Sequence, residues 1–158
     1  MTRGATVAAK RQASADACPV MRTVDLVGDR WTLLILRDAF DGPARFSQLQ
    51  RSLGIAKNIL SDRLGGLVEA GILRTAPAAD TSAYQAYALT DKGRDLFNVI
   101  IALRQWGEQY AFDPGEDYRP LIDQTTGEPL PHLTYARPDG SPVRPSETAL
   151  GEVRPIGA

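Results

Sequence analysis

The chain has 158 residues, a formal net charge of −1 and a single cysteine. No apolar run reaches the roughly 20 residues that a membrane-spanning helix needs, and the first residues lack the apolar region of a secretory signal. One cysteine excludes a disulfide within the chain, which fits a cytoplasmic protein. The net charge excludes a uniformly basic protein, although residues 1–75 have a small positive excess and residues 113–158 are acidic.

The beginning of the chain predicts a polar arm followed by two helices. Residues 1–17 are small, polar and alanine-rich, so they bury little apolar surface and we expect them to be disordered. A helix is expected to start at Cys18-Pro19, because proline suits the first helical position. Asp29 is expected to cap a second, largely buried helix over residues 30–40, and Asp41-Gly42-Pro43 is expected to end it.

Residues 44–70 have the pattern of two short helices joined by a tight turn. We expect one helix over residues 44–53 and another over residues 57–70, with Gly54-Ile55 between them. One face of the second helix is apolar, formed by Leu60, Leu64, Leu67 and Val68. Two short helices around a glycine-containing turn are typical of a helix-turn-helix motif.

After Gly71 the pattern changes to short strands. Residues 72–75 and 84–89 predict a β-hairpin of the kind called a wing. Thr90-Asp91 then predicts the start of one long helix that continues to about Phe112. The fold class is therefore mainly α with a small β-hairpin wing (α+β), a winged helix-turn-helix expected to be dimeric.

Composition divides the chain into three parts. Residues 1–17 form the arm, residues 18–112 the winged helix-turn-helix domain, and residues 113–158 an acidic extension that holds eight of the eleven prolines. Within the extension, Asp139-Gly140 predicts the turn of a small hairpin.

Short motifs follow one another in a specific order between Cys18 and Tyr110. They are Cys18-Pro19-Val20, Gly28-Asp29-Arg30-Trp31, Arg45-Phe46, Leu60-Ser61-Asp62-Arg63-Leu64, Gly71-Ile72-Leu73, Tyr87-Ala88-Leu89-Thr90-Asp91-Lys92-Gly93 and Trp106-Gly107. This ordered set resembles the HxlR-type family of winged helix-turn-helix transcriptional regulators. The resemblance implies a cytoplasmic homodimer that binds double-stranded DNA and represses or activates nearby genes.

Four features depart from the usual pattern of that family. Ala56 stands where a capping serine is common, and Gly65-Gly66 lies inside the second helix of the motif. The expected wing tip, residues 77–83, has no lysine or arginine. The extension has no cysteine, and because His132 alone cannot form a zinc site, we expect neither a metal nor a cofactor.

The second helix of the motif is expected to lie in the major groove of DNA, with its N-terminal residues at the base edges. If its leucines face the core, polar side chains and Gly65 lie on or near the outer face. Asn58 is suited to pair with adenine and Lys57 with guanine or phosphate, while Arg45 and Arg63 are suited to phosphates. The expected DNA-binding residues are Arg45, Lys57, Asn58, Ser61, Asp62 and Arg63. Gly65-Gly66 indicates either close approach to DNA or a neighbouring helix, or an exposed face without a constraint.

Apolar residues in the first and last helices exceed what a single small core needs. We expect some of them to pack against a second copy, which would present two recognition helices to an inverted repeat. The expected dimerisation residues are Val20, Val24, Leu96, Ile100, Leu103 and Tyr110. A small-molecule effector is compatible with this dimer, in a cavity lined by Trp31, Trp106 and Tyr110, although such aromatic residues also form ordinary cores.

Cys18 is a candidate redox sensor. It precedes a helix, and the positive end of the helix dipole favours negative charge. A bridge between the Cys18 residues of two copies, a mixed disulfide or alkylation would each modify it. The alternative is a small residue without a reactive role.

Two other function classes are alternatives to DNA binding. The sequence offers no nucleophile elbow, metal-ligand cluster or glycine-rich phosphate loop, so we do not expect an enzyme. A winged helix that binds proteins and not specific DNA is the stronger alternative, because the wing tip is uncharged and the recognition helix holds two glycines.

Overall fold

A computed structural model describes residues 18–77 and 85–152 of the chain. These residues belong to two compact units, which divide between Ile100 and Ile101, inside the last helix. The arm expected over residues 1–17 and most of the expected wing tip lie outside the described residues. The expectations about both, and the composition-based boundary at residue 112, stay predictions.

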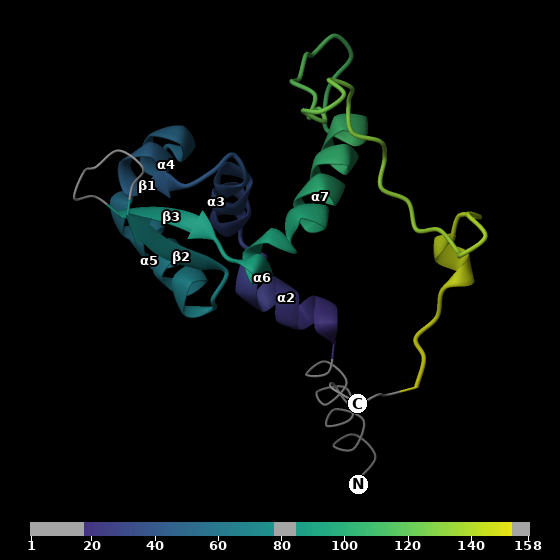
Figure 1. The fold of residues 1–158 in the computed structure, drawn as a ribbon, viewed down its shortest axis with the longest axis horizontal. Coiled ribbons are helices and arrows are strands. Elements are labelled where there is room, and N and C mark those ends of the chain that lie inside the picture. The colour runs from purple at the N-terminus through teal and green to yellow at the C-terminus, as the bar shows by residue number, and fades with distance from the viewer. Residues whose placement is uncertain (1–17, 78–84, 153–158) are drawn as a thin grey trace, which may run out of the picture. The chain divides into compact units, whose positions relative to one another are not determined.

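Among the described residues of the first unit, four helices precede the hairpin (Figure 1). They are α2 (Pro19–Val27), α3 (Arg30–Phe40), α4 (Phe46–Leu53) and α5 (Lys57–Glu69). Local signals set the starts of α2 and α3 as predicted. Pro19 occupies the first turn of α2. The Asp29 carboxylate accepts the backbone N–H groups of Trp31 and Thr32 at 3.0 and 3.2 Å, which caps α3.

In the part of the chain that the structure describes, three short antiparallel strands form a sheet in the order β1-β3-β2. They are β1 (Ala44–Arg45), β2 (Leu73–Pro77) and β3 (Gln85–Leu89), with Leu73 opposite Leu89 and Ala44 opposite Tyr87. The prediction that the helix begins at residue 44 was wrong. Ala44 and Arg45 pair with β3, and the helix starts at Phe46, where the Gln48 side chain accepts the Arg45 backbone N–H at 2.7 Å.

The core of the first unit joins α3, α4, α5 and the strands. Its completely buried large side chains are Ile35, Leu36, Leu49, Leu60, Leu64, Ile72 and Leu73. Burial of each such side chain is worth about 1.5–3 kcal/mol. The core therefore holds α5 firmly against the rest of the unit by its leucine face.

The long final helix that the sequence predicts is interrupted. It consists of α6 (Asp91–Arg94) and α7 (Phe97–Tyr110), joined by a turn at residues 95–96. Around this turn the Leu96 N–H donates to the Gly93 carbonyl and the Val99 N–H to the Leu96 carbonyl, both i to i−3 bonds in place of the α-helical pattern. The predicted cap at Thr90 is confirmed, since its hydroxyl accepts the Gly93 N–H at 3.1 Å.

The second unit contains the end of α7 and the proline-rich extension. The extension has two isolated antiparallel bridges, Ile122 with Pro129 and Ala136 with Pro142, followed by the 3-10 helix η1 (Pro145–Glu147). Asp139 lies in the turn of the second bridge and accepts the Ser141 N–H at 2.9 Å, so the predicted hairpin is reduced to one bridge. Among the residues that the structure describes, no helix is long and apolar enough to cross a membrane.

Candidate nucleic-acid interface

Helix α5 has one buried face and one exposed polar face. Leu60, Leu64 and Leu67 are buried, as predicted, and Val68 is half-buried. Asn58 and Asp62 lie on the opposite face and Lys57, Ser61 and Arg63 lie on its flanks, and all five side chains are exposed. The structure thus brings five of the six predicted DNA-binding residues onto one helix, all of them accessible to a ligand.

The connection between α4 and α5 is short and fixed. Gly54 ends α4 with φ of 62°, a conformation that favours glycine, and Ile55 is buried directly after it. Ala56 precedes α5 and supplies no side-chain cap. The first backbone N–H groups of α5 therefore have no side-chain cap at this position, and a helix N-terminus of this kind suits an anion such as phosphate.

The other end of α5 is attached to the beginning of α6. Gly71 follows the helix with φ of 66°, and the Lys92 ammonium donates to the Ala70 carbonyl at 2.7 Å. The Thr90 hydroxyl donates to the Gly71 and Ile72 carbonyls at 2.6 and 3.0 Å. The Thr90 cap was predicted from the sequence, but these contacts were not, because nothing in the local pattern points to a partner so far along the chain.

Arg63 is linked to the cap of α3. Its Nε lies 3.1 Å from Oδ1 of Asp29, and both side chains are partly exposed. Partial burial acts to raise the pKa of Asp29, but hydrogen bonds from the hydroxyl and backbone of Thr32, the Arg63 charge and the Trp31 N–H outweigh it and hold that pKa below its usual value. One carboxylate therefore caps α3 and orients a cation of the candidate recognition helix.

Arg45, the sixth predicted residue, lies on β1 at the start of α4 and is half-buried. Arg74 on β2 is exposed and was not predicted as a site residue. Its only sequence signal is its place in the strand that leads into the wing.

Gly65 and Gly66 lie on the exposed part of α5. A Cβ atom built on either glycine would have no neighbour within 4 Å in this chain. Close packing against another helix of the described chain, one of the readings of this pair, is therefore wrong. Close approach to DNA, and an unconstrained exposed face, stay open.

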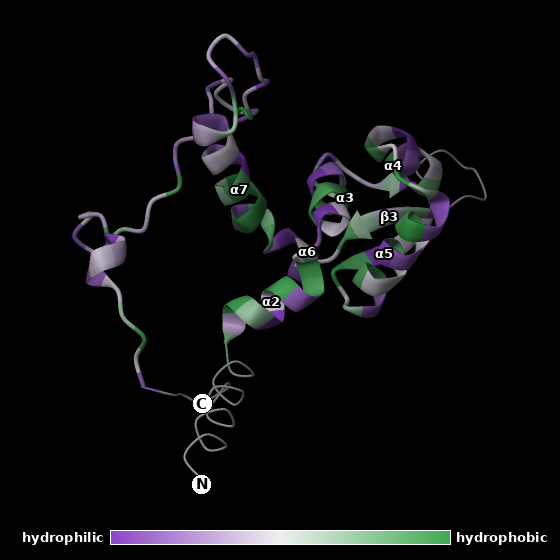
Figure 2. Cartoon of the chain, turned by 180° about the vertical axis from the view of Figure 1, so that it is seen from behind, coloured by the Kyte–Doolittle hydropathy of each residue, from purple (hydrophilic) through white to green (hydrophobic). Residues whose placement is uncertain are grey.

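Helices α2 and α7 contain stretches of hydrophobic residues (Figure 2), and several of their large apolar side chains are exposed. Val20 and Val24 on α2 and Leu103 and Tyr110 on α7 each expose at least half of their surface, and Trp106 is 63% exposed. Leu96 and Ile100 instead pack partly against the core of the first unit. Trp31, one of the three residues expected to line an effector cavity, also packs against that core.

Cys18 occupies the position before α2 and is partly accessible. The described residues contain no cluster of histidine, cysteine and acidic side chains that could hold a metal ion.

Comparison with known proteins shows which family has this geometry. The profile of the HxlR-like helix-turn-helix family matches residues 26–114, which include α3 to α7. The uncharacterized HTH-type transcriptional regulator Rv3095 of Mycobacterium tuberculosis is 48% identical over 109 residues, covering 69% of each chain. The HTH-type transcriptional regulator YodB of Bacillus subtilis is 32% identical over 101 residues, which cover 63% of this chain and 89% of YodB.

Solved structures have the same fold. The crystal structure of PA1607 matches with a TM-score of 0.81 at 47% identity, over 86% of this chain and 95% of PA1607. The redox regulator HypR in its reduced form matches with a TM-score of 0.55 at 27% identity, over 60% of this chain and 94% of HypR. The family profile, the relatives and the winged helix-turn-helix geometry agree: the chain belongs to the HxlR-like helix-turn-helix family of transcriptional regulators.

Proposed function

We propose that the protein binds an inverted-repeat DNA operator as a homodimer and so controls transcription, with one α5 helix of each copy in the major groove. The observation that carries this proposal is the division of α5 into a buried leucine face and an exposed polar face. A two-fold dimer presents two such helices about 34 Å apart, which is one turn of DNA. The protein would act in the cytoplasm, where bacterial DNA is accessible.

The first turns of α5 would read the bases. Asn58 can pair with adenine through two hydrogen bonds, and Lys57 can donate to guanine or a phosphate. Ser61 can donate to either type of group, and Asp62 can accept from the amino group of cytosine. All four side chains are exposed on the same helix, which supports these roles.

Arg45 and Arg63 would hold phosphates and so fix the register of the protein on DNA. The Asp29 carboxylate supports this role for Arg63, because it fixes Nε at 3.1 Å while the side chain stays partly exposed. The N-terminus of α5 adds backbone N–H groups directed outward from the helix end.

The two copies would associate through the apolar faces of α2 and α7. Exposure of Val20, Val24, Leu103 and Tyr110 supports this, since an isolated chain rarely exposes so many large apolar groups together. Leu96 and Ile100 would contribute the part of their surface that the core leaves uncovered.

A binding titration tests the proposal. We expect the Asn58→Ala variant to lose about tenfold or more in affinity for the operator upstream of its own gene, since one base contact is worth roughly 1–3 kcal/mol. Lys57→Ala should also reduce the dependence of affinity on salt. Asn98→Ala, an exposed asparagine on α7, is the matched control and should bind like the unmodified protein.

Light scattering measures the mass of each variant in solution, and we expect twice the mass of one chain. Unchanged operator affinity in the double variant Lys57→Ala, Asn58→Ala would contradict the proposal. It would instead favour the alternative, a winged helix that binds proteins.

We further propose that oxidants modify Cys18 and change DNA affinity. The accessibility of Cys18 supports this, as does the fold likeness to HypR, which is described as a redox regulator. Two Cys18 thiols can form one disulfide between copies while diamide takes up the two electrons and two protons. Mass spectrometry and a gel shift after diamide treatment test it: unmodified Cys18, or modified Cys18 with unchanged DNA affinity, would contradict this role.

A further inference from the structure

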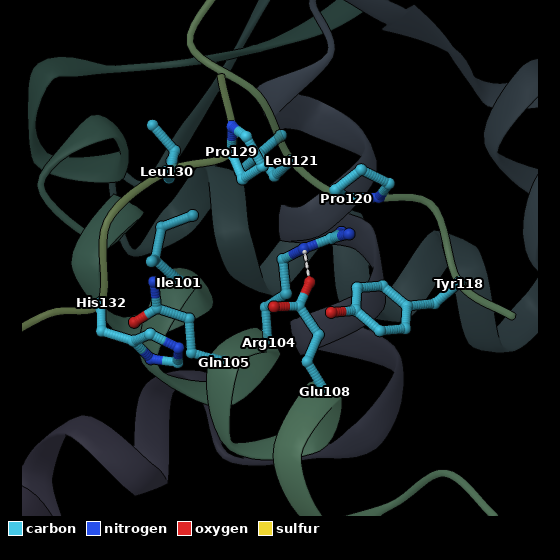
Figure 3. A pocket seen from close by; sticks show the side chains of 10 residues that line it. All are labelled: Ile101, Arg104, Gln105, Glu108, Tyr118, Pro120, Leu121, Pro129, Leu130 and His132. Carbon is cyan, nitrogen blue, oxygen red and sulfur yellow. Dashed lines mark ion pairs between the residues drawn. The ribbon is translucent and has the colours of Figure 1, made fainter. Parts of the chain in front are cut away.

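The second unit contains a cavity of about 240 Å³ that DNA binding does not use (Figure 3). Helix α7 supplies the polar part of its wall, with Arg104 and Glu108. The extension supplies an apolar part with Pro120, Leu121 and Leu130, and Tyr118 adds a hydroxyl group. The HxlR-like profile ends at residue 114, so all of these extension residues lie beyond it.

The wall of the cavity is held in place by hydrogen bonds. The Gln105 amide donates to the Pro131 carbonyl and accepts the Leu133 N–H, both at 2.9 Å, which fastens the extension to α7. The Leu130 N–H donates to the Leu121 carbonyl at 3.0 Å, and the Arg104 guanidinium donates to the Arg119 carbonyl. A cavity with such a fixed wall loses little free energy in ordering itself around a ligand.

The charge of the wall restricts the ligand. Arg104 Nε and Glu108 Oε1 are both buried and lie 2.6 Å apart as an ion pair. The Arg104 and Glu108 charges of the lining therefore cancel each other. A charged ligand would leave one charge without a partner at a partly buried site, which is unfavourable. An uncharged ligand is favoured.

The shape and the polar groups of the cavity restrict the choice of ligand further. In Figure 3 the Tyr118 hydroxyl points toward the Glu108 carboxylate, below the side chains of Pro120 and Leu121. A ligand group at this place would donate to Glu108 and accept from Tyr118, as a hydroxyl or a carboxamide does. A cavity of about 150 Å³ holds benzene in another protein, so the larger volume here suits one ring with a substituent.

We propose that this cavity binds a small uncharged single-ring compound that bears a hydroxyl or carboxamide group, and that this compound is an effector. Binding of the compound to the cavity does not depend on the proposed function. Its effect on operator affinity rests on the proposed function.

Phenol and benzamide are suitable probes, titrated into the full-length protein labelled with ¹⁵N and followed by amide chemical shifts. We expect saturable shifts confined to residues 101–132, with a Kd on the order of 1 mM or tighter for at least one probe. Toluene, which lacks the polar group, and benzoate, which is charged, should bind at least tenfold more weakly. No saturable shift with either probe, or equal binding of benzoate, would overturn the proposal.

Two variants locate the site. Leu130→Trp fills the cavity and should weaken binding at least tenfold, whereas Leu150→Trp, the same change at a fully exposed leucine, should leave it unchanged. Tyr118→Phe keeps the ring and removes the hydroxyl, so it should weaken binding several-fold even if Leu130→Trp disturbs the extension. Unchanged binding in both cavity variants would overturn the site.

A gel shift with and without the bound probe separates the two proposals. A change in operator affinity that Tyr118→Phe abolishes would support the effector role. Binding of the probe with unchanged operator affinity would overturn the effector role and leave the site. If the protein did not bind the operator at all, the result of the titration with phenol or benzamide would still test the cavity.

Discussion

The two compact units of this chain are stabilised in different ways. In the first, α3, α4, α5 and the strands share a core of completely buried leucine and isoleucine side chains. In the second, Ile101 is the one buried large apolar side chain in the described part, and Gln105 and Arg104 hold the extension through backbone carbonyl and N–H groups. The first unit therefore depends on a large apolar core that supports α5, whereas the second depends mainly on hydrogen bonds to backbone groups.

The largest expected effect is a contrast between two leucines. Leu64→Ala should lower the free energy of unfolding by about 2–5 kcal/mol, because it leaves a cavity in the core. Leu133→Ala in the extension, where the side chain is 45% exposed, should cost less than about 0.5 kcal/mol. Urea denaturation measures both. Equal losses would mean that the extension belongs to the same cooperative unit as the core.

Two glycines allow a second contrast inside the first unit. A Cβ on Gly93 would lie 2.2 Å from the Ile72 carbonyl oxygen, so Gly93→Ala should cost about 1–3 kcal/mol. A Cβ on Gly65 meets nothing in the chain, so Gly65→Ala should stabilise the protein by about 0.5–1 kcal/mol. Thermal unfolding compares the two variants. A gel shift of the Gly65→Ala variant then distinguishes the two open readings of this glycine. If α5 approaches DNA closely at Gly65, the added methyl group should weaken DNA binding; if the face is unconstrained, DNA binding should not change.

Asp29 gives a smaller effect that depends on pH. Asp29→Ala should cost about 1 kcal/mol at pH 7, because α3 loses its cap. The pKa of Asp29 is lower in the folded chain than its ordinary value of 3.8, so its ionised form stabilises the fold above that value. The difference between wild type and variant should therefore be complete at pH 7 and disappear as the pH falls through the folded pKa. A difference that grows below pH 4 would contradict this, and denaturation at several pH values decides it.

The smallest expected effect on stability is that of Gln105→Ala. The global free energy of unfolding should change by less than about 0.5 kcal/mol, because only exposed hydrogen bonds are lost. Exchange of the Leu133 amide hydrogen should become at least tenfold faster, since Gln105 is the group that accepts it. Gln109→Ala, on the same helix and exposed, is the control. Unchanged exchange at Leu133 would show that the extension is held by other contacts.

Elements with local signals were predictable from the sequence. The bounds of α3, the Asp29 and Thr90 caps and the leucine face of α5 each depend on residues within one or two helical turns. Strand β1 was not predictable, because it depends on pairing with β3 from a distant part of the chain. The Thr90 contacts with Gly71 and Ile72 were not predictable for the same reason.

The candidate site was likewise predictable only in part. Helical spacing was sufficient to predict the exposed face of α5, but it gives no information on the partner of Arg63 or on the role of Lys92. Nor can spacing distinguish an apolar side chain that packs within its own chain from one that faces a second copy. Leu96 and Leu103 both fit the predicted stripe, yet only Leu96 packs against the core.

The junction between α5 and α6 has a consequence for protein engineering. The Thr90 N–H and hydroxyl both donate to the Ile72 carbonyl, Lys92 reaches Ala70, and Gly93 has no room for a side chain. Residues 90–93 thus complete the end of the recognition helix even though they open the following segment. A chimera that exchanges the C-terminal part of this regulator should be spliced after Arg94, because a join directly after β3 would remove the groups that terminate α5.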